Sequence, residues 1–321
     1  MKRIFANRWI KTIFIILIVF GVGPFLIPVP KLAGTQPAKS LADSDSQFIE
    51  INGLELHVKT FGDGEPAFLL LHGFGASLYS WNSVIWTLSE QGKVIVYDRP
   101  AFGLSERPLT WDGQNPYSSE TQNELVLGLL DYYKLENAIL IGNSAGGTIA
   151  MQFALAYPER VSALILVDPA VYGQAGAPKW IRPLLSIPQI DRLGPLFVRK
   201  LLENGTSMVE SAWNDSSKIT TETIKLYKKP LLVDNWDRAL WEFTLASTSS
   251  NLKNELDQFA LPILVITGDN DQIVPTTDSI RLADALPNAT LVVIKNAGHV
   301  PHEEQTQDFL NAVQDFLANN F

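Results

Sequence analysis

The sequence predicts an α/β protein with a mostly parallel central sheet and helices on both faces of that sheet. Two observations support this class. Short apolar runs alternate with helix-like stretches along most of the chain, and parallel strands need crossover connections of that kind. Of 321 residues, 46% are hydrophobic and 18% are charged, which supplies the material for a sizeable core.

The expected elements follow in order along the chain. Residues 48–61 hold two β-rich runs joined by Asn52-Gly53, a dipeptide typical of a tight hairpin turn. Continuous apolar runs of strand length, typical of strands buried on both faces, are 67–73, 94–98, 138–142, 163–168, 262–268 and 290–294. The stretches predicted as helices are 118–134, 145–157, 276–286 and 303–318.

One connection is far longer than the few residues that usually join such elements. About ninety residues separate Asp168 from Leu261. The tryptophans in this stretch, with helix-like spacing in places, are Trp180, Trp213, Trp236 and Trp241. We predict a helical cap at 172–257 over the carboxyl edge of the sheet, where ligands bind in open α/β sheets. A packing appendage without a role in the site is the alternative. The core is then 47–171 and 258–321.

The N-terminal segment differs from the rest of this acidic chain. Its basic residues, with no acid among them, are Lys2, Arg3, Arg8 and Lys11. Residues 13–27 carry no charge, and 9–30 form 22 residues of low polarity, close to the roughly 20 that a membrane-spanning helix needs. We therefore expect residues 1–30 to be a membrane anchor with a cytoplasmic N-terminus. The rest of the protein would then be extracytoplasmic.

Two alternatives to the anchor remain open. A cleaved signal peptide would lead to secretion, but its nearest small-x-small site, Ser40-Leu41-Ala42, lies rather far downstream. A buried core helix fits poorly, because the run is apolar on all faces and lies at the terminus. Residues 31–46 are small, polar and contain proline, so they are predicted to be a linker.

The amino-acid composition excludes several classes of function. The net charge of −9 argues against a nucleic-acid partner, since no basic stripe could neutralise phosphates. The chain has no cysteine, which excludes disulfides, thiolate catalysis and cysteine-bound metals. A catalytic base must be sought among four histidines, His57, His72, His299 and His302.

A candidate nucleophile lies between a predicted strand and a predicted helix. Residues 142–146 read Gly-Asn-Ser-Ala-Gly, with Ser144 in the centre. Small residues on both sides allow the strained turn that raises a serine hydroxyl above a sheet. The following helix directs its free N–H groups and its positive end towards the reacting centre. A glycine–serine turn that only packs helix against sheet is the alternative.

A serine needs a base, and the base needs a carboxylate that fixes its tautomer. His299 follows the last predicted strand on a loop, whereas His302 resembles a helix-start residue, so we favour His299. Asp271 follows the strand at 262–268, and the order serine, aspartate, histidine is the one that α/β hydrolases use. Asp269 and Asp168 are the alternative carboxylates, either of which could instead cap a helix.

The tetrahedral intermediate also needs hydrogen-bond donors for its oxyanion. One is expected to be the backbone N–H of Ala145. The second is expected from Leu-His-Gly-Phe-Gly at 71–75, after the strand that ends at Leu71. His72 in this segment is expected to support the loop rather than to transfer protons.

Five segments together resemble the α/β-hydrolase superfamily. LHGFG, YDRPAFGLS, GNSAGG, GDNDQIVP and GHVPHEE occur in the order that this superfamily shows, and the resemblance covers about residues 48–320. It implies an α/β-hydrolase fold and an oxyanion hole made by Phe74 and Ala145. It also implies a structural loop shaped by Asp98, Arg99 and Gly103.

Ser144 separates the chain from haloalkane dehalogenases and epoxide hydrolases, which have an aspartate at that place. The chain looks closer to esterases, carbon–carbon bond hydrolases and cofactor-free haloperoxidases. We predict a serine hydrolase that cleaves an ester-like bond of a small or medium apolar substrate through an acyl-enzyme. Carbon–carbon bond hydrolysis or a haloperoxidase-like activity is the alternative.

Two further classes fit less well. A nucleotide-binding enzyme would use Gly73 and Gly75, but Leu78 stands where that fingerprint needs a small residue. A catalytically inactive binding protein on the same fold would be expected to have lost part of the serine–histidine–aspartate set. We expect no metal and no organic cofactor. The expected partners are a small apolar substrate and, through the N-terminal helix, a membrane, and the sequence does not indicate the oligomeric state.

Overall fold

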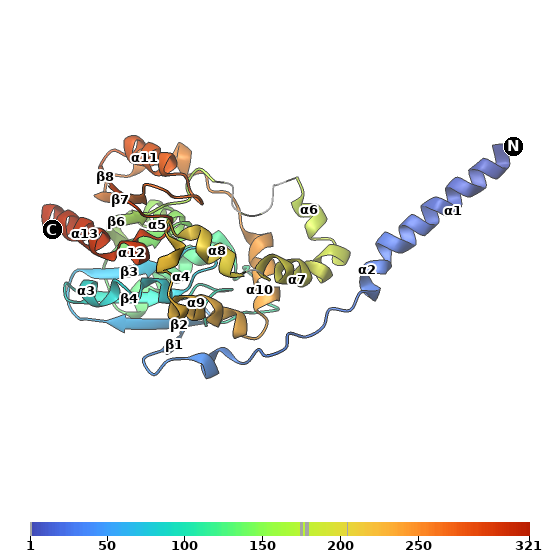
Figure 1. Ribbon diagram of the computed structural model, residues 1–321, viewed down its shortest axis with the longest axis horizontal. Helices are drawn as coiled ribbons and strands as arrows, with labels where there is room; N and C mark the ends of the chain where they lie inside the picture. The colour runs from blue at the N-terminus through green and yellow to red at the C-terminus, as the bar shows by residue number, and fades with distance from the viewer. Residues whose placement is uncertain (1, 174–175, 177–179, 204) are drawn as a thin grey trace.

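The computed structural model describes residues 2–173, 176, 180–203 and 205–321. An eight-stranded sheet with the strand order β1-β2-β4-β3-β5-β6-β7-β8 forms its centre (Figure 1). The strands are β1 (Gln47–Ile51), β2 (Leu54–Phe61), β3 (Ala67–Leu71), β4 (Lys93–Tyr97), β5 (Ala138–Asn143), β6 (Val161–Val167), β7 (Ile263–Gly268) and β8 (Ala289–Ile294). Strand β2 is antiparallel to both of its neighbours. All other pairs are parallel.

Helices cover both faces of the sheet. They are α3 (Ile85–Ser89), α4 (Ser119–Tyr132), α5 (Ala145–Ala156), α11 (Thr276–Ala285), α12 (Pro301–Glu304) and α13 (Thr306–Asn320). Leu69 packs in a cluster with residues of α4, α5 and α11, whereas its neighbour Phe68 packs with residues of α3 and α13. Successive side chains of a strand point to opposite faces, so the continuous apolar runs fill two cores. The predicted α/β class with helices on both faces is confirmed.

The long insertion between β6 and β7 is helical. It contains α6 (Arg182–Leu185), α7 (Pro188–Leu202), α8 (Gly205–Ala212), α9 (Thr221–Lys228) and α10 (Trp236–Ala246). A side chain on Gly194 would lie 2.1 Å from the Trp241 ring, so α7 and α10 pack closely there. Of the cap predicted at 172–257, residues 174, 175, 177–179 and 204 lie outside the described residues.

The transmembrane helix predicted at the N-terminus is wrong. In the part of the chain that the structure describes, no helix is long and apolar enough to cross a membrane. Helix α1 (Lys2–Gly21) includes all four basic residues of the N-terminal flank, which leaves residues 12–21 as its uncharged part. Those ten residues span about 15 Å, half of the roughly 30 Å hydrocarbon core. The predicted membrane anchor and the single-pass localisation derived from it are corrected accordingly.

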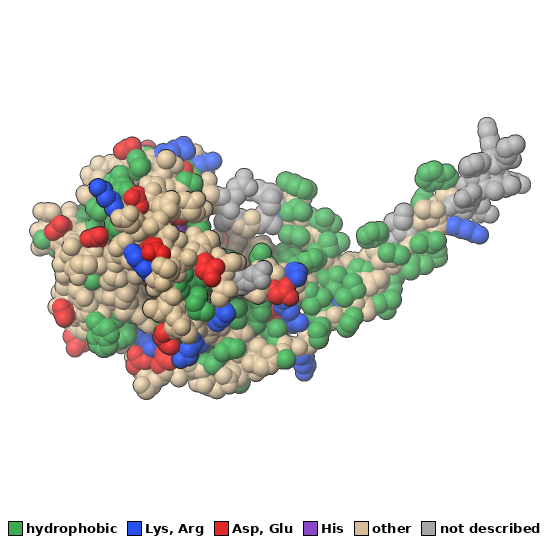
Figure 2. All heavy atoms as spheres, in the orientation of Figure 1, with side chains coloured by type: hydrophobic (Ala, Val, Ile, Leu, Met, Phe, Trp, Pro, Cys, Tyr) green, Lys and Arg blue, Asp and Glu red, His purple; other side chains and the backbone are tan. Residues whose placement is uncertain are grey.

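Helix α1 extends away from the sheet, and apolar side chains lie along this arm (Figures 1 and 2). The short helix α2 (Gly23–Leu26) links it to the insertion. There Arg192 of α7 donates hydrogen bonds to the carbonyls of Pro24, at 3.1 Å, and Ile27, at 2.7 Å. The segment predicted as a linker also contacts the body, since Thr35 donates a 2.7 Å hydrogen bond to Asp234.

Candidate active site

Ser144 occupies the turn from β5 into α5. Its φ of 53° and ψ of −116° lie in a region that side-chain-bearing residues rarely adopt. A Cβ atom on Gly142 would lie 2.6 Å from the backbone of Gly146, and one on Gly146 would lie 2.1 Å from the Leu71 carbonyl. Glycine at both positions therefore lets the chain turn tightly over the end of β3. The serine lies at the carboxyl edge of the sheet.

His299 and Asp271 come together on two neighbouring loops at the same edge. The Nδ1 atom of His299 lies 2.7 Å from Oδ2 of Asp271. The other carboxylate oxygen accepts hydrogen bonds from the N–H groups of Ile273, at 2.7 Å, and Val274, at 3.0 Å. A carboxylate held in this way fixes the orientation and tautomer of the imidazole.

No sequence motif assigned a role to Asn143, which connects the His299 loop to the end of β6. Asn143, which precedes the serine, donates from its amide nitrogen to the carbonyls of His299, at 3.1 Å, and Val167, at 3.2 Å. The His299 N–H in turn donates to the Ala212 carbonyl of α8, at 2.7 Å. A buried asparagine ending an apolar strand was a usable signal for Asn143. The contact with Ala212 required the tertiary structure.

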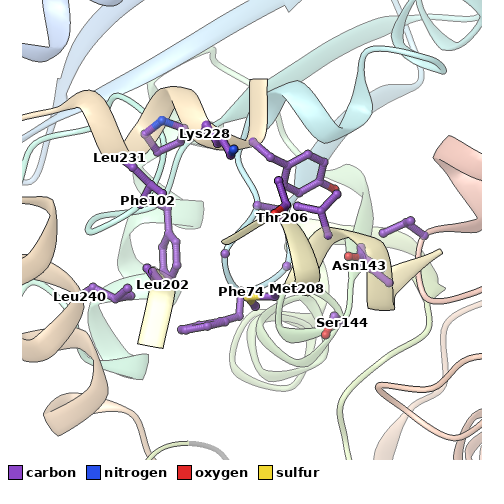
Figure 3. A pocket seen from close by; sticks show the side chains of 18 of the residues that line it. Phe74, Phe102, Asn143, Ser144, Leu202, Thr206, Met208, Lys228, Leu231 and Leu240 are labelled. Atoms are coloured by element: carbon purple, nitrogen blue, oxygen red, sulfur yellow. The ribbon is translucent and has the colours of Figure 1, made fainter. Parts of the chain in front are cut away.

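Ser144 and His299 line one cavity of about 160 Å³ together with Phe74 and residues of the insertion. Figure 3 shows Ser144 and Asn143 on one side of it, with Leu202 and Leu240 across the space. Its other apolar lining residues include Phe102, Met208, Val209, Ile224, Leu231, Trp236 and Ile273. The polar side chains in the wall include Arg107, Thr206, Tyr227 and Lys228. The site therefore joins a serine and a histidine to a mostly apolar space.

The two expected oxyanion donors lie next to the serine. A Cβ atom on Gly73 would lie 3.3 Å from the Cβ of Ser144, so the loop that carries Phe74 approaches the serine closely. Ala145 is the first residue of α5, where N–H groups have no partner within the helix. Within the described residues, the N–H groups of Phe74 and Ala145 donate to no backbone carbonyl. Both are thus available to a ligand.

The alternative base, His302, and one alternative acid, Asp269, have surroundings that differ from those of His299 and Asp271. His302 is buried against Trp81, with 4.4 Å between the ring centroids. Burial lowers the pKa of His302 to about 3, so this imidazole stays neutral. Asp269 is exposed, and its carboxylate accepts a 3.3 Å hydrogen bond from the N–H of Ala297.

Asp168 lies close to the His299–Asp271 pair. One donor atom from each of these three side chains lies within 4.8 Å of the others, a grouping that could hold a metal ion. Oδ1 of Asp168 accepts hydrogen bonds from the Thr267 hydroxyl, at 2.7 Å, and the Gly268 N–H, at 3.1 Å. Burial, followed by the charge of Asp271, raises the pKa of Asp168 well above its usual value. That the protein uses no metal therefore remains a prediction from the sequence.

His72 is also buried, and both of its ring nitrogens are used. Nδ1 donates to the Gly73 carbonyl at 2.8 Å, and Nε2 accepts the N–H of Arg99 at 3.1 Å. Burial lowers the pKa of His72 to about 3. This histidine braces the loop that carries Phe74, and proton transfer is not supported by its contacts.

Comparisons with known proteins show the family of the chain. A family model described as alpha/beta hydrolase fold matches residues 66–306. A 2-hydroxy-6-oxononadienedioate/2-hydroxy-6-oxononatrienedioate hydrolase of Dechloromonas aromatica is 32% identical, over 85% of this chain and 96% of that protein. One of the same name from Cupriavidus pinatubonensis is 29% identical, over 89% of this chain and 96% of the relative.

Solved structures extend the comparison. A meta-cleavage product hydrolase from Pseudomonas fluorescens superposes with a TM-score of 0.64 at 26% identity, covering 85% of this chain and 97% of that one. A thermophilic esterase from Thermogutta terrifontis gives a TM-score of 0.68 at 24% identity and covers 85% of this chain and 96% of that one. At this identity the likeness is one of fold alone. The chain therefore belongs to the α/β-hydrolase family and is a hydrolase.

Proposed function

We propose that this hydrolase cleaves a carbon–carbon bond beside a ketone carbonyl in a small, unsaturated oxo acid. The observation that carries the proposal is that several relatives over most of the chain share the name of a hydrolase for such a compound. The sequence alone placed ester cleavage first and carbon–carbon cleavage second. The names of the relatives favour the second.

The proposed chemistry assigns one role to each residue of the site. The Ser144 hydroxyl adds to the ketone carbon while His299 accepts its proton. The N–H groups of Phe74 and Ala145 stabilise the oxyanion. Asp271 orients His299 and stabilises the imidazolium.

Collapse of this intermediate breaks the carbon–carbon bond. The bonding electron pair leaves on the carbon of the departing fragment, and His299 delivers its proton there. Before the bond breaks, the enol proton of the substrate moves to the carbon beside the ketone and makes that carbon tetrahedral. The electron pair left on it by cleavage is then conjugated with the unsaturated acid, which makes the carbon an acceptable leaving group. Water, deprotonated by the same histidine, then hydrolyses the acyl-enzyme and restores Ser144.

Ester cleavage is the second candidate. The mostly apolar walls around Phe102, Leu202 and Leu240 suit a hydrocarbon chain at least as well as a diacid. The same nucleophile, base and oxyanion donors would act, with an alkoxide as the leaving group in place of a carbanion. The two candidates differ only in the bond that breaks.

The test compares both bonds on one preparation. We expect kcat/KM for 2-hydroxy-6-oxononadienedioate, followed by loss of its dienol absorbance, to exceed that for p-nitrophenyl butyrate by about 100-fold. Ser144→Ala should abolish both activities. Turnover of the ester without turnover of the oxo acid would overturn carbon–carbon cleavage in favour of the second candidate.

A further inference from the structure

The backbone around the His299 side chain is held by hydrogen bonds on both sides. The His299 carbonyl accepts the Asn143 amide at 3.1 Å, and the His299 N–H donates to the Ala212 carbonyl at 2.7 Å. The N–H of the preceding residue, Gly298, donates to Oε2 of Glu304 at 2.8 Å. Asn143 ends β5, Ala212 ends α8 of the insertion, and Glu304 ends α12. The position of the base therefore depends on three separate elements.

The buried carboxylate of Glu304 joins two of these elements. Its Oε2 atom also accepts the N–H of Asn214, at 2.9 Å, and its Oε1 atom accepts the N–H of Asp215, at 2.7 Å. Both of these residues follow α8 in the insertion. Among the described residues, the hydrogen-bond partners of this side chain are all backbone N–H groups. Hydrogen bonds to a carboxylate are stronger than neutral ones, so Glu304 ties the base loop firmly to the insertion.

The backbones of the base loop and the insertion approach each other closely beside this carboxylate. A Cβ atom on Gly298 would lie 2.5 Å from the Ala212 carbonyl oxygen and 2.7 Å from the Asn214 nitrogen. The side-chain amide of Asn270, which directly precedes Asp271, also donates to the Asn214 side chain. Movement of this part of the insertion therefore displaces both loops of the acid–base pair.

We propose that Glu304 is a positioning residue, which makes the place of the catalytic base depend on how the insertion docks on the core. Glu304 does not line the cavity of Ser144, and it acts through the N–H of Gly298 and the segment at 212–215. The insertion then has a second role besides lining the apolar space, because it supports the histidine. The inference rests on the proposed function only in taking Ser144 as the nucleophile and His299 as its base.

The test changes Glu304 and measures the rate at which an ethyl fluorophosphonate inactivates the full chain. Glu304→Leu keeps the approximate size of the side chain and removes both acceptor oxygens. It should slow inactivation about 100-fold, because a displacement of about 1 Å at a catalytic group costs that much. Glu304→Gln should slow it only about three- to tenfold, since its amide oxygen still accepts the N–H groups of Gly298 and Asn214 and only the bond to Asp215 is lost. Circular dichroism at the assay temperature reports whether each variant is folded.

Ser83→Ala is the matched control. The Ser83 hydroxyl donates to the His302 carbonyl in α12 at 2.8 Å, so this variant loses a hydrogen bond to the same short helix. The bonds from Glu304 to the base loop and to the insertion stay in place. The rate of inactivation should therefore remain within about twofold of the wild type.

Proton NMR separates an effect on the base from an effect on the whole fold. The Nδ1 atoms of His57 and His299 each lie 2.7 Å from a carboxylate oxygen, so each N–H should give a low-field resonance. Asp271→Asn identifies the resonance of His299 by removing it. In Glu304→Leu we expect the His299 resonance to shift or broaden while the His57 resonance stays unchanged.

A folded Glu304→Leu variant that reacts at the wild-type rate would overturn the proposal. Slower inactivation with both resonances unchanged, or with both lost, would also overturn it, because Glu304 would then act on another step or on the fold as a whole. Should Glu304→Leu not fold, Glu304→Gln decides, and a wild-type rate with an unmoved His299 resonance would reject the positioning role. Because the fluorophosphonate needs only the serine and its base, failure of carbon–carbon cleavage would leave this result standing.

Discussion

The molecule contains two serine–histidine–aspartate sets, and the histidine–carboxylate distance is 2.7 Å in both. In one, the His57 Nδ1 atom lies 2.7 Å from Asp98 and its Nε2 atom lies 2.8 Å from the Ser46 hydroxyl. In the other, His299 lies 2.7 Å from Asp271 and shares a cavity with Ser144. A histidine paired with a carboxylate therefore does not define a catalytic site by itself.

The surroundings separate the two sets. Asp98 also accepts the N–H groups of Leu78 and Leu104, each at 2.7 Å, and a Cβ atom on Gly103 would lie 1.8 Å from its carboxyl group. This carboxylate thus fixes the loop after β4, and His57 is fully buried. Ser46 does not line the cavity of Ser144. Only the second set combines its serine with a helix start and a space for a substrate.

The largest expected effect is on kcat, and it distinguishes Ser144 from Ser46. Ser144→Ala should lower kcat by about 10⁵-fold and abolish labelling by a fluorophosphonate, because it removes the nucleophile. Ser46→Ala should leave kcat within about twofold, since its hydroxyl contacts His57 and the Asp43 N–H and does not line the cavity of Ser144. Equal labelling of the two variants would remove the distinction between the sets.

The next effect separates the aspartates. Asp271→Asn should lower kcat by about 10³–10⁴-fold, because the uncharged amide neither stabilises the imidazolium nor enforces the tautomer. Circular dichroism should show an intact fold. Asp98→Asn should change kcat far less, once assayed at a temperature where that variant is folded. A larger kcat loss for Asp98→Asn would contradict a purely structural role for the first set.

The free energy of unfolding should depend more on Asp98 than on Asp271, the reverse of the order expected for kcat. Asp98→Ala should lower the free energy of unfolding by about 3–5 kcal/mol, since it leaves buried donors unpaired. Burial alone would raise the pKa of Asp98, but the hydrogen bond and charge of His57 hold it below its usual value. This stabilisation is present above the unfolded pKa of about 3.9 and is lost as pH falls through the folded value. Urea unfolding at pH 5 and pH 3 should therefore give a smaller pH effect in Asp98→Asn than in the wild type.

A smaller effect is expected at Asp168. Asp168→Asn should change kcat by less than about tenfold, because its hydrogen-bond acceptor oxygen is retained. The raised pKa of Asp168 gives a stability contribution that is complete below about pH 3.9 and is lost as pH rises through the folded value. The variant should therefore lose less Tm than the wild type between pH 5 and pH 8. A kcat loss as large as that of Asp271→Asn would place the catalytic acid at Asp168, directly after β6.

Local patterns were sufficient to predict much of this architecture. The apolar runs at 67–73 and 138–142 predicted β3 and β5, since strands buried on both faces need uninterrupted apolar residues. The glycines around Ser144 predicted its turn because no side chain fits there. Asp271 and His299 were chosen by their place after strands, and the structure brings them within hydrogen-bond distance.

Features that depend on contacts distant in the sequence could not be predicted in this way. No motif marks Ser46 as a partner of His57. The register of β1 with β2 and the path of the chain before β1 bring the two residues together. The space between Gln122, Ala145 and Ser247 forms only when α4, α5 and the end of the insertion come together. The N-terminal error had another cause: apolarity was counted over 9–30, but α1 ends at Gly21 and includes Lys11.

The smallest expected effect concerns the apolar cavity, which only the Ser144 set possesses. Alkyl fluorophosphonates with chains of two to eight carbons react with the serine whichever bond the natural substrate presents. Each methylene buried against Leu202, Leu240 and Phe102 should stabilise the complex by up to about 0.8 kcal/mol, or roughly fourfold in the second-order rate of inactivation. The gain should stop once the cavity of about 160 Å³ is full. Leu240→Ala should shift this limit to longer chains and leave the rate for the two-carbon reagent unchanged, because a short chain does not reach across the cavity. A flat profile from two to eight carbons would show that the insertion is a packing appendage and that chain recognition lies elsewhere.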